Sequence, residues 1–303
     1  MGCGASVPKR KISVSDNGLA QQLPKHLLLG VSPQFIRTFC ASHGVDDETT
    51  AEEIGEVVAE VLGDEAQVSL AEASREFVGG DGKQRTLRTA NGRPAVAKAT
   101  LFVVHAHSCL FLRLLEALDS YLELHGLAAE NQYLWIDCFS TRRALVDPVA
   151  AVRHTAEIVP RVGRVVITCD PWNSPVALTR LWCLHELVAA QASEAVVHLA
   201  MTMADRRTFI HALQTKRRTI EADLSHVDAR TAATSHDADR DALHAALRSR
   251  RRGSLGGAMS GRKSSQGSNA STGDDEAAFD AFNELARAAM MQAIQAFAWK
   301  QDL

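Results

Sequence analysis

Apolar residues follow two different periods along this chain. Four short runs are almost wholly apolar, as expected for strands covered on both faces of a sheet: residues 99–106, 133–139, 164–169 and 195–201. After each run, apolar residues recur at helical spacing, over residues 109–126, 148–159, 178–191 and 204–218. Four strand–helix units in series predict an α/β fold whose parallel sheet carries helices on both faces. Right-handed crossovers then bring the carboxyl ends of the strands to one edge, where such folds bind ligands.

The segments on either side of these units have other patterns. In residues 24–78, Ser32 is a candidate helix N-cap before Pro33, and apolar residues recur at helical spacing further on, which predicts a small helical subdomain without chemistry of its own. The composition of residues 79–98 and 248–275 predicts linkers. The predicted organisation is a leader (1–20), the helical subdomain (24–78), a linker (79–98), the α/β domain (99–220), a helical extension (221–247), a disordered linker (248–275) and a C-terminal helix (276–303) that packs back on the sheet.

The N-terminus carries three signals for membrane attachment. Gly2 followed by Ser6 fits the pattern for N-myristoylation, Cys3 is a candidate palmitoylation site, and residues 9–11 are basic. One myristoyl chain binds membranes only reversibly, so the further signals predict a stable lipid anchor on the cytoplasmic face of a membrane. The alternative is a leader that merely contains small residues. No apolar run approaches the roughly 20 residues that span a bilayer, so we expect no transmembrane segment.

Composition and charge exclude several classes of protein. Apolar residues make up 46% of the chain, enough for a substantial core. The net charge of -3 creates no field that attracts nucleic acid, so we expect no nucleic-acid partner. Six scattered cysteines without a C-x-x-C pair indicate a reduced, intracellular protein. No Gly-rich phosphate loop follows a predicted strand, which argues against a nucleoside triphosphatase.

Candidate functional side chains lie where predicted strands end. Asp137 lies at the carboxyl end of the second predicted strand, and His105 and His107 lie at the end of the first, two positions apart and therefore on one side. Two histidines and one distant carboxylate are weak support for a metal site, and we expect none. We expect instead that one histidine hydrogen-bonds within the ligand edge and that the other caps the following helix.

The helix over residues 178–191 carries the most specific motif. Trp182 and Glu186 are four positions apart and share a face. The run Trp182-Cys183-Leu184-His185-Glu186-Leu187 resembles the S-x-W-C-x-x-E-L helix of the TIR (Toll/interleukin-1 receptor homology) domain superfamily. The order of elements over about residues 99–215 is also similar, and the W-I-D strand resembles that of heterokaryon-incompatibility domains. The nearest likeness is a protist group with a W-I-D strand and an L-T-R-x-W-C-x-x-E helix. The resemblance implies a flavodoxin-like parallel sheet.

The resemblance also implies a chemistry. In enzymatic TIR domains the glutamate of this helix holds the ribose hydroxyls of NAD⁺ while the nicotinamide bond breaks, and the matching residue is Glu186. One well-placed carboxylate can stabilise the oxocarbenium character that develops on the ribose. NAD⁺ would then be a substrate, and the candidate binding residues are Trp182, His105, Ser108, Asp137 and Ser140. The alternative is that Glu186 is an ordinary surface carboxylate and that the Trp-Cys pair only packs.

Two classes of function stay open at this point. In the first, the chain is a membrane-anchored signalling protein whose TIR-like domain forms homo-oligomers and recruits protein partners. In the second, it is an NAD⁺ hydrolase. The sequence slightly favours the first, because the H-A-H-S segment and the lack of a glycine after the W-I-D strand depart from the enzymatic pattern. Whether Glu186 and Trp182 line a concave pocket discriminates between the two.

The segment R-R-R-G-S-L is a candidate phosphorylation site. Ser254 follows Arg251 and Arg252, in a pattern that resembles substrates of basophilic cyclic-nucleotide-dependent kinases. A phosphate among these arginines would add negative charge and weaken contact with an anionic leaflet. The alternative is an incidental basic linker.

Overall fold

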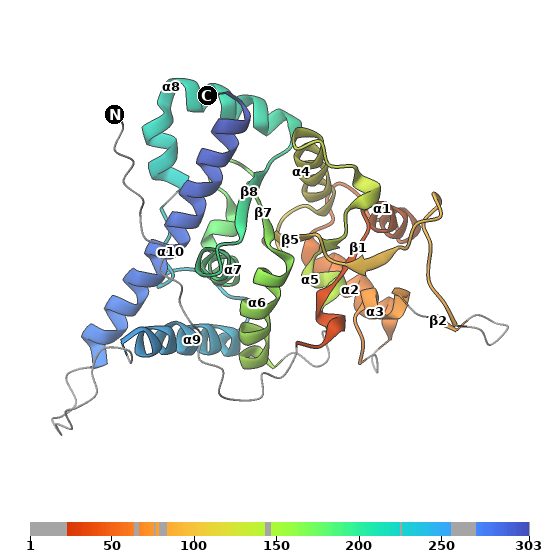
Figure 1. Ribbon diagram of the computed structural model, residues 1–303, viewed down its shortest axis with the longest axis horizontal. Helices are drawn as coiled ribbons and strands as arrows, with labels where there is room; N and C mark the ends of the chain where they lie inside the picture. Colours follow the sequence, from red (N-terminus) through yellow and green to blue (C-terminus); the bar gives the residue numbers. More distant parts are fainter. Residues whose placement is uncertain are drawn as a thin grey trace, which may run out of the picture.

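A six-stranded sheet with helices on both faces forms the centre of the molecule (Figure 1). The structure, a computed structural model, describes residues 23–63, 67–75, 77–78, 84–142, 147–224, 226–255 and 271–302. The lipidation candidates Gly2 and Cys3 lie outside the described residues. No helix in these ranges is both long enough and apolar enough to cross a bilayer.

The four predicted strands are present and pair in parallel, but the second is shorter than predicted, because residues 137–139 belong to a helix. They are β5 (Leu101–Val104), β6 (Leu134–Trp135), β7 (Arg164–Thr168) and β8 (Val196–Ala200), in the spatial order β6-β5-β7-β8. The chain therefore runs from β5 to β6 on one side and then crosses to β7 on the other. This is a flavodoxin-like order, with its topological switch point beside β5, where ligands bind in open α/β sheets.

Two further strands extend the sheet and make it mixed rather than purely parallel. β1 (Leu29–Val31) pairs antiparallel with both β4 (Val96–Lys98) and β6, so residues predicted as a helical subdomain and as a linker contribute to the main sheet. A Cβ on Gly30 would lie only 2.9 Å from the carbonyl carbon of Tyr133, so glycine permits this close pairing. Strands of three residues are too short to show an alternating pattern, which is why the sequence did not reveal them.

Alternate strand residues face two hydrophobic cores. Leu101 and Val103 point to the core formed with α1 (Pro33–Ser42), α2 (Ala51–Leu62), α3 (Leu70–Arg75), α4 (Phe111–Leu124) and α5 (Asp137–Ser140). Phe102 and Val104 point to the core formed with α6 (Pro148–Val162), α7 (Leu181–Ala192), α8 (Met203–Leu224), α9 (Asp237–Leu255) and α10 (Ser271–Lys300). Figure 1 shows α7 and α10 on one side of the sheet and α1, α2 and α4 on the other. The period-two alternation thus fixes which helices cover which face.

Short elements complete the chain. The turns of 3-10 helix are η1 (Lys25–Leu28), η2 (Ala129–Asn131) and η4 (Val176–Thr179), and β2 (Phe77–Val78) pairs with β3 (Gln84–Arg85). The predicted N-cap is confirmed, because the Ser32 hydroxyl accepts a hydrogen bond from the Phe35 amide at 3.2 Å.

The C-terminal part departs in one respect from its prediction. α10 packs against α7 and β8, as expected for a helix that returns to the sheet. Residues 248–255 and 271–275, predicted as parts of a disordered linker, continue α9 and begin α10 instead. Ser254 therefore lies within α9, and only its backbone is described.

The packing around α7 determines the surroundings of Glu186. Eight of the 12 residues of α7 are buried, since α6, α10 and the sheet surround it. Glu186 is one of the residues of α7 that remain half-buried. Its carboxyl therefore lies mostly against protein, with partial access to solvent.

Candidate active site

A cavity of about 890 Å³ opens at the carboxyl ends of β5 and β6. Its walls come from α2, α6, α7 and the start of α9, which lie far apart in the sequence. Its volume falls within the range of small-molecule sites, roughly 300–1,000 Å³. The polar or aromatic residues that line it include Glu52, His105, His107, Trp135, Asp137, Thr141, Thr155, Arg180, Trp182, Glu186, Ser235, His236 and Asp239.

Trp182 and Glu186 both line this cavity. The Trp182 Nε1–H donates a hydrogen bond of 3.0 Å to Oδ2 of Asp239, which ties the first turn of α9 to α7 and fixes the indole. One turn further along α7, Glu186 reaches the same cavity. The concave pocket on which the choice between the two functional classes depends is therefore present.

Cys183 explains why α7 is held so close to the strand ends. Its buried thiol donates a hydrogen bond to the carbonyl oxygen of His105 at 3.1 Å, and burial raises its pKa well above the usual range. A thiol that is buried and bonded in this way is structural rather than nucleophilic. Cys183 thus fastens α7 to the end of β5.

Two causes favour the neutral form of the Glu186 carboxyl in this cavity. Burial raises its pKa well above the ordinary value, and the charge of the nearby Asp137 raises it further. A buried acid with a like charge beside it favours the protonated state. A cationic group entering the cavity would reverse this preference and favour the carboxylate.

Asp137 behaves in the opposite way. Burial acts to raise its pKa, but the imidazoles of His107 and His105 outweigh burial and hold the pKa well below its usual range. Nε2 of His107 hydrogen-bonds to Oδ2 of Asp137, and Nε2 of His105 lies 3.4 Å from Oδ1. The pKa values of two carboxyls in one cavity are thus shifted in opposite directions, an arrangement typical of acid–base sites.

The structure brings together four of the six predicted site residues. His105, Asp137, Trp182 and Glu186 line the cavity, whereas neither Ser108 nor Ser140 is among the described residues that do so. Ser108 is exposed and Ser140 is 2% exposed within α5.

The expectation that a histidine caps the following helix is wrong. α4 begins after Leu110 without a side-chain cap, and His107 bonds to Asp137 instead.

Sequence reasoning missed the walls of the cavity. α2, predicted to have no chemistry, contributes Glu52 and apolar side chains, and the start of α9 contributes Ser235 and Asp239. Arg180, just before α7, was not singled out either. No local pattern marks these residues, because tertiary packing alone brings them to the strand ends.

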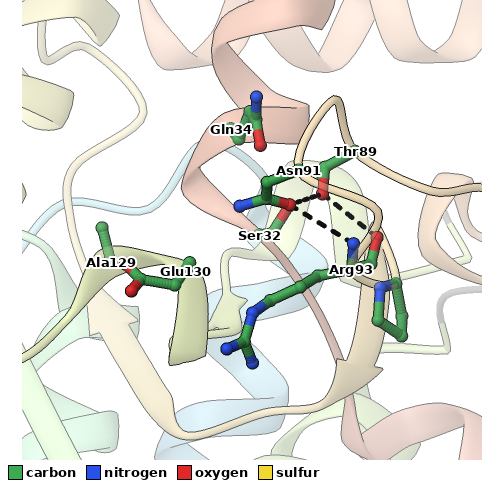
Figure 2. Close-up of a pocket in the computed structure, with 8 residues that line it drawn as sticks. Ser32, Gln34, Thr89, Asn91, Arg93, Ala129 and Glu130 are labelled. Atoms are coloured by element: carbon green, nitrogen blue, oxygen red, sulfur yellow. Dashed lines mark hydrogen bonds between the residues drawn. The ribbon is translucent and has the colours of Figure 1, made fainter.

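A second, smaller pocket of about 210 Å³ lies beside α1 (Figure 2). Its polar groups serve a local turn, in which the Thr89 hydroxyl and the Arg93 amide both donate hydrogen bonds to Oδ1 of Asn91. Because these groups already satisfy one another, the pocket offers little to a ligand. The larger cavity is the better candidate site.

Comparisons of this chain with protein-family models, with curated proteins and with solved structures found no match. The cavity and its side chains are therefore the structural evidence for a function. The TIR-like resemblance of the Trp182–Leu187 motif stays a prediction.

Proposed function

We propose that this chain is an NAD⁺ hydrolase in which Glu186 is the catalytic carboxylate. The observation that carries the proposal is that Glu186 and Trp182 lie one helical turn apart and line the same 890 Å³ cavity. The likeness of their helix to the W-C-x-x-E helix of TIR domains supports the same choice. A surface carboxylate, the alternative for Glu186, would not have a pKa raised by burial.

The chemistry makes limited demands on the protein. The bond between ribose C1 and the nicotinamide nitrogen breaks, and its electron pair leaves with nicotinamide. Water adds to C1, and the overall reaction gives nicotinamide, ADP-ribose and a proton. The ribose is oxocarbenium-like in the transition state, and a carboxylate beside it stabilises this positive charge in a cavity of low dielectric.

The raised pKa of Glu186 fits a cationic substrate. The nicotinamide ring of NAD⁺ carries a positive charge, which favours ionisation of Glu186 when the ring enters the cavity. The ionised carboxylate is then available as positive charge moves to the ribose. NADH has a neutral dihydropyridine ring and would not induce this ionisation, so NADH should bind more weakly.

Two further residues have roles in binding. The Trp182 indole, oriented by its hydrogen bond to Asp239, offers a flat face for stacking. Arg180 supplies a positive charge at the cavity wall, where its guanidinium bonds to Ser235 Oγ at 2.7 Å. We propose that Trp182 stacks on a ring of the dinucleotide and that Arg180 faces its diphosphate.

The decisive experiment is NAD⁺ consumption by the full chain on anionic lipid vesicles. Glu186→Gln should lower turnover at least about 100-fold, whereas Glu123→Gln, a matched change of an exposed glutamate on α4, should leave it intact. If the wild-type protein is folded and membrane-bound and still turns over no NAD⁺, the hydrolase proposal fails. The interaction module would then be the function to pursue.

The lipid anchor and self-association belong to the same proposal. Acylation at Gly2 and Cys3 would hold the chain at the cytoplasmic face of a membrane and raise its local concentration, which favours homo-oligomers. Gly2→Ala should move the protein into the soluble fraction of cells. Unchanged membrane partition of that variant would contradict the anchor.

A further inference from the structure

We infer that His105, His107 and Asp137 form a binding site for a divalent transition-metal ion of the Zn²⁺ class. The three residues each offer one donor atom, and these atoms all lie within 4.8 Å of one another. All three also line the large cavity, so a bound ion would keep an open face toward it. This inference does not rest on the proposed hydrolase activity, because Glu186 supplies no ligand.

His105 carries the strongest indication of a missing ligand. The residue is 7% exposed, and its Nε2 has no hydrogen-bond partner. Buried ring nitrogens almost always have a partner, because an unsatisfied one costs free energy. A cation among the three donor atoms would satisfy this nitrogen, and it would also balance the charge of Asp137.

The surroundings orient His105 as in known metal sites. A hydrogen bond with the backbone of Val103 acts on its ring, while Nε2 has no partner. Metal-binding histidines commonly donate one N–H to a carbonyl oxygen, which leaves the lone pair of the other nitrogen for the ion. Asp137 is supported in the same way, because its Oδ1 accepts a hydrogen bond of 2.7 Å from the Cys138 amide.

The donor set selects the class of ion. Two imidazole nitrogens and one carboxylate oxygen occur in catalytic zinc sites and in non-haem iron(II) sites. Mg²⁺ and Ca²⁺ prefer oxygen ligands throughout, and Cu⁺ prefers sulfur. The neighbouring thiol of Cys183 is engaged with the His105 carbonyl oxygen and is not needed as a ligand.

The distances require only a small rearrangement, in which the contact between His107 and Asp137 lengthens and the widest separation shortens. Zinc bonds of about 2.0–2.1 Å in a tetrahedral site place ligand atoms about 3.3 Å apart. His105 Nε2 and Asp137 Oδ1 already lie 3.4 Å apart. The widest separation, at most 4.8 Å, needs a movement of about 1.5 Å. His107 can supply this movement by giving up its hydrogen bond to Oδ2 of Asp137, because its side chain is 37% exposed.

This inference revises the expectation drawn from sequence. Asp137 lies 30 positions after His107 in the chain, so spacing alone gave little support for a metal site. The parallel pairing of β5 with β6 places the residues that follow these strands side by side. The hydrogen bond between His107 and Asp137 then completes the cluster.

The test is metal binding by the full chain, without a histidine tag and after treatment with a chelator. We expect one equivalent of Zn²⁺ to bind, and Co²⁺ to give the intense visible absorption of a low-coordinate site. His107→Ala should lower the affinity for Zn²⁺ more than about 100-fold, since even losing a supporting contact of a ligand costs 10–100-fold. The matched control is His211→Ala, an exposed histidine on α8, which should bind Zn²⁺ like the wild type.

Further variants distinguish loss of the metal site from loss of the fold. His105→Ala removes a buried side chain, so its effect counts only if thermal unfolding shows a folded protein. His107 is partly exposed, and its replacement should leave the fold intact. Equal Zn²⁺ affinity of wild type and His107→Ala, or no stoichiometric binding by the wild type, would overturn the metal site. Glu186→Gln should keep full Zn²⁺ binding while losing NAD⁺ turnover, so the two proposals can fail separately.

Discussion

Two clusters of histidines in this molecule show how similar side chains acquire different roles. His105 and His107 meet Asp137 beside a large cavity, whereas His125 and His198 pack against one another and against Tyr121, with ring centroids 4.8 Å apart for the histidine pair. Asp137 stabilises positive charge in the first cluster, while Arg164 disfavours it in the second. A carboxylate and an open cavity make a candidate site; aromatic packing makes part of the core.

The largest expected effect is a loss of NAD⁺ turnover without a loss of stability when Glu186 is replaced. Glu186→Gln should lower NAD⁺ turnover about 100-fold to 1,000-fold, because the variant cannot provide the negative charge. Stability near neutral pH should hardly change, because the raised pKa favours the neutral carboxyl and Gln has nearly the same shape. Steady-state kinetics and urea unfolding of the same preparation test both statements. A variant that loses activity only because it unfolds would contradict this separation.

The second effect concerns stability in the His125–His198 cluster. Burial and the charges of His125 and Arg164 lower the pKa of His198 to about 4. The unfolded chain therefore binds the proton more readily, so stability is lost as pH falls from about 6.5 toward 4. Between about pH 7.5 and pH 5, His198 should account for about 1–2 kcal/mol, after allowance for its partial exposure.

His198→Phe tests this account. The variant should lose less stability than the wild type over the same pH interval, and its turnover near neutral pH should be unchanged. Urea unfolding at both pH values measures the difference. Parallel losses in the two proteins would show that His198 does not titrate as described.

The third effect is a shift in a pH profile. Turnover should rise with pH as the Glu186 carboxyl ionises, and the raised pKa places this rise above the range of an ordinary glutamate. Asp137→Asn removes one of the two causes of the raised pKa, so the rise should move to lower pH, while burial keeps part of the shift. Profiles of kcat/KM recorded with a chelator present would show it. An unmoved profile would mean that Asp137 does not act on Glu186.

The smallest effect is expected at the cavity wall. Trp182→Phe keeps an aromatic face but loses the hydrogen bond to Asp239, so KM should rise several-fold, with kcat nearly unchanged. Trp182→Ala also removes stacking and should raise KM further, about tenfold. A change confined to kcat would place Trp182 in the chemical step rather than in binding.

Prediction from sequence succeeded where the pattern is local. The apolar runs identified β5, β6, β7 and β8, and helical spacing identified α4, α6, α7 and α8 within a few residues of their ends. It failed for β1 and β4, whose three-residue strands hold no period, and for residues 248–255, whose polar composition does not prevent them from being helical. β1 and β4 form because they pair with each other and with β6, which are neighbours distant in sequence.

For the site, the sequence determined the residue types and their placement at strand ends and on one helix face. Trp182 and Glu186 share a face because they are four positions apart, and Asp137 follows a strand because the apolar run ends there. Only the tertiary structure decided that α2, α6 and α9 enclose these residues, that the histidines converge on Asp137, and that Glu186 is half-buried in the cavity. The physical reason is that burial and charge proximity depend on packing across the chain, and these two properties determine what a carboxyl or an imidazole can do.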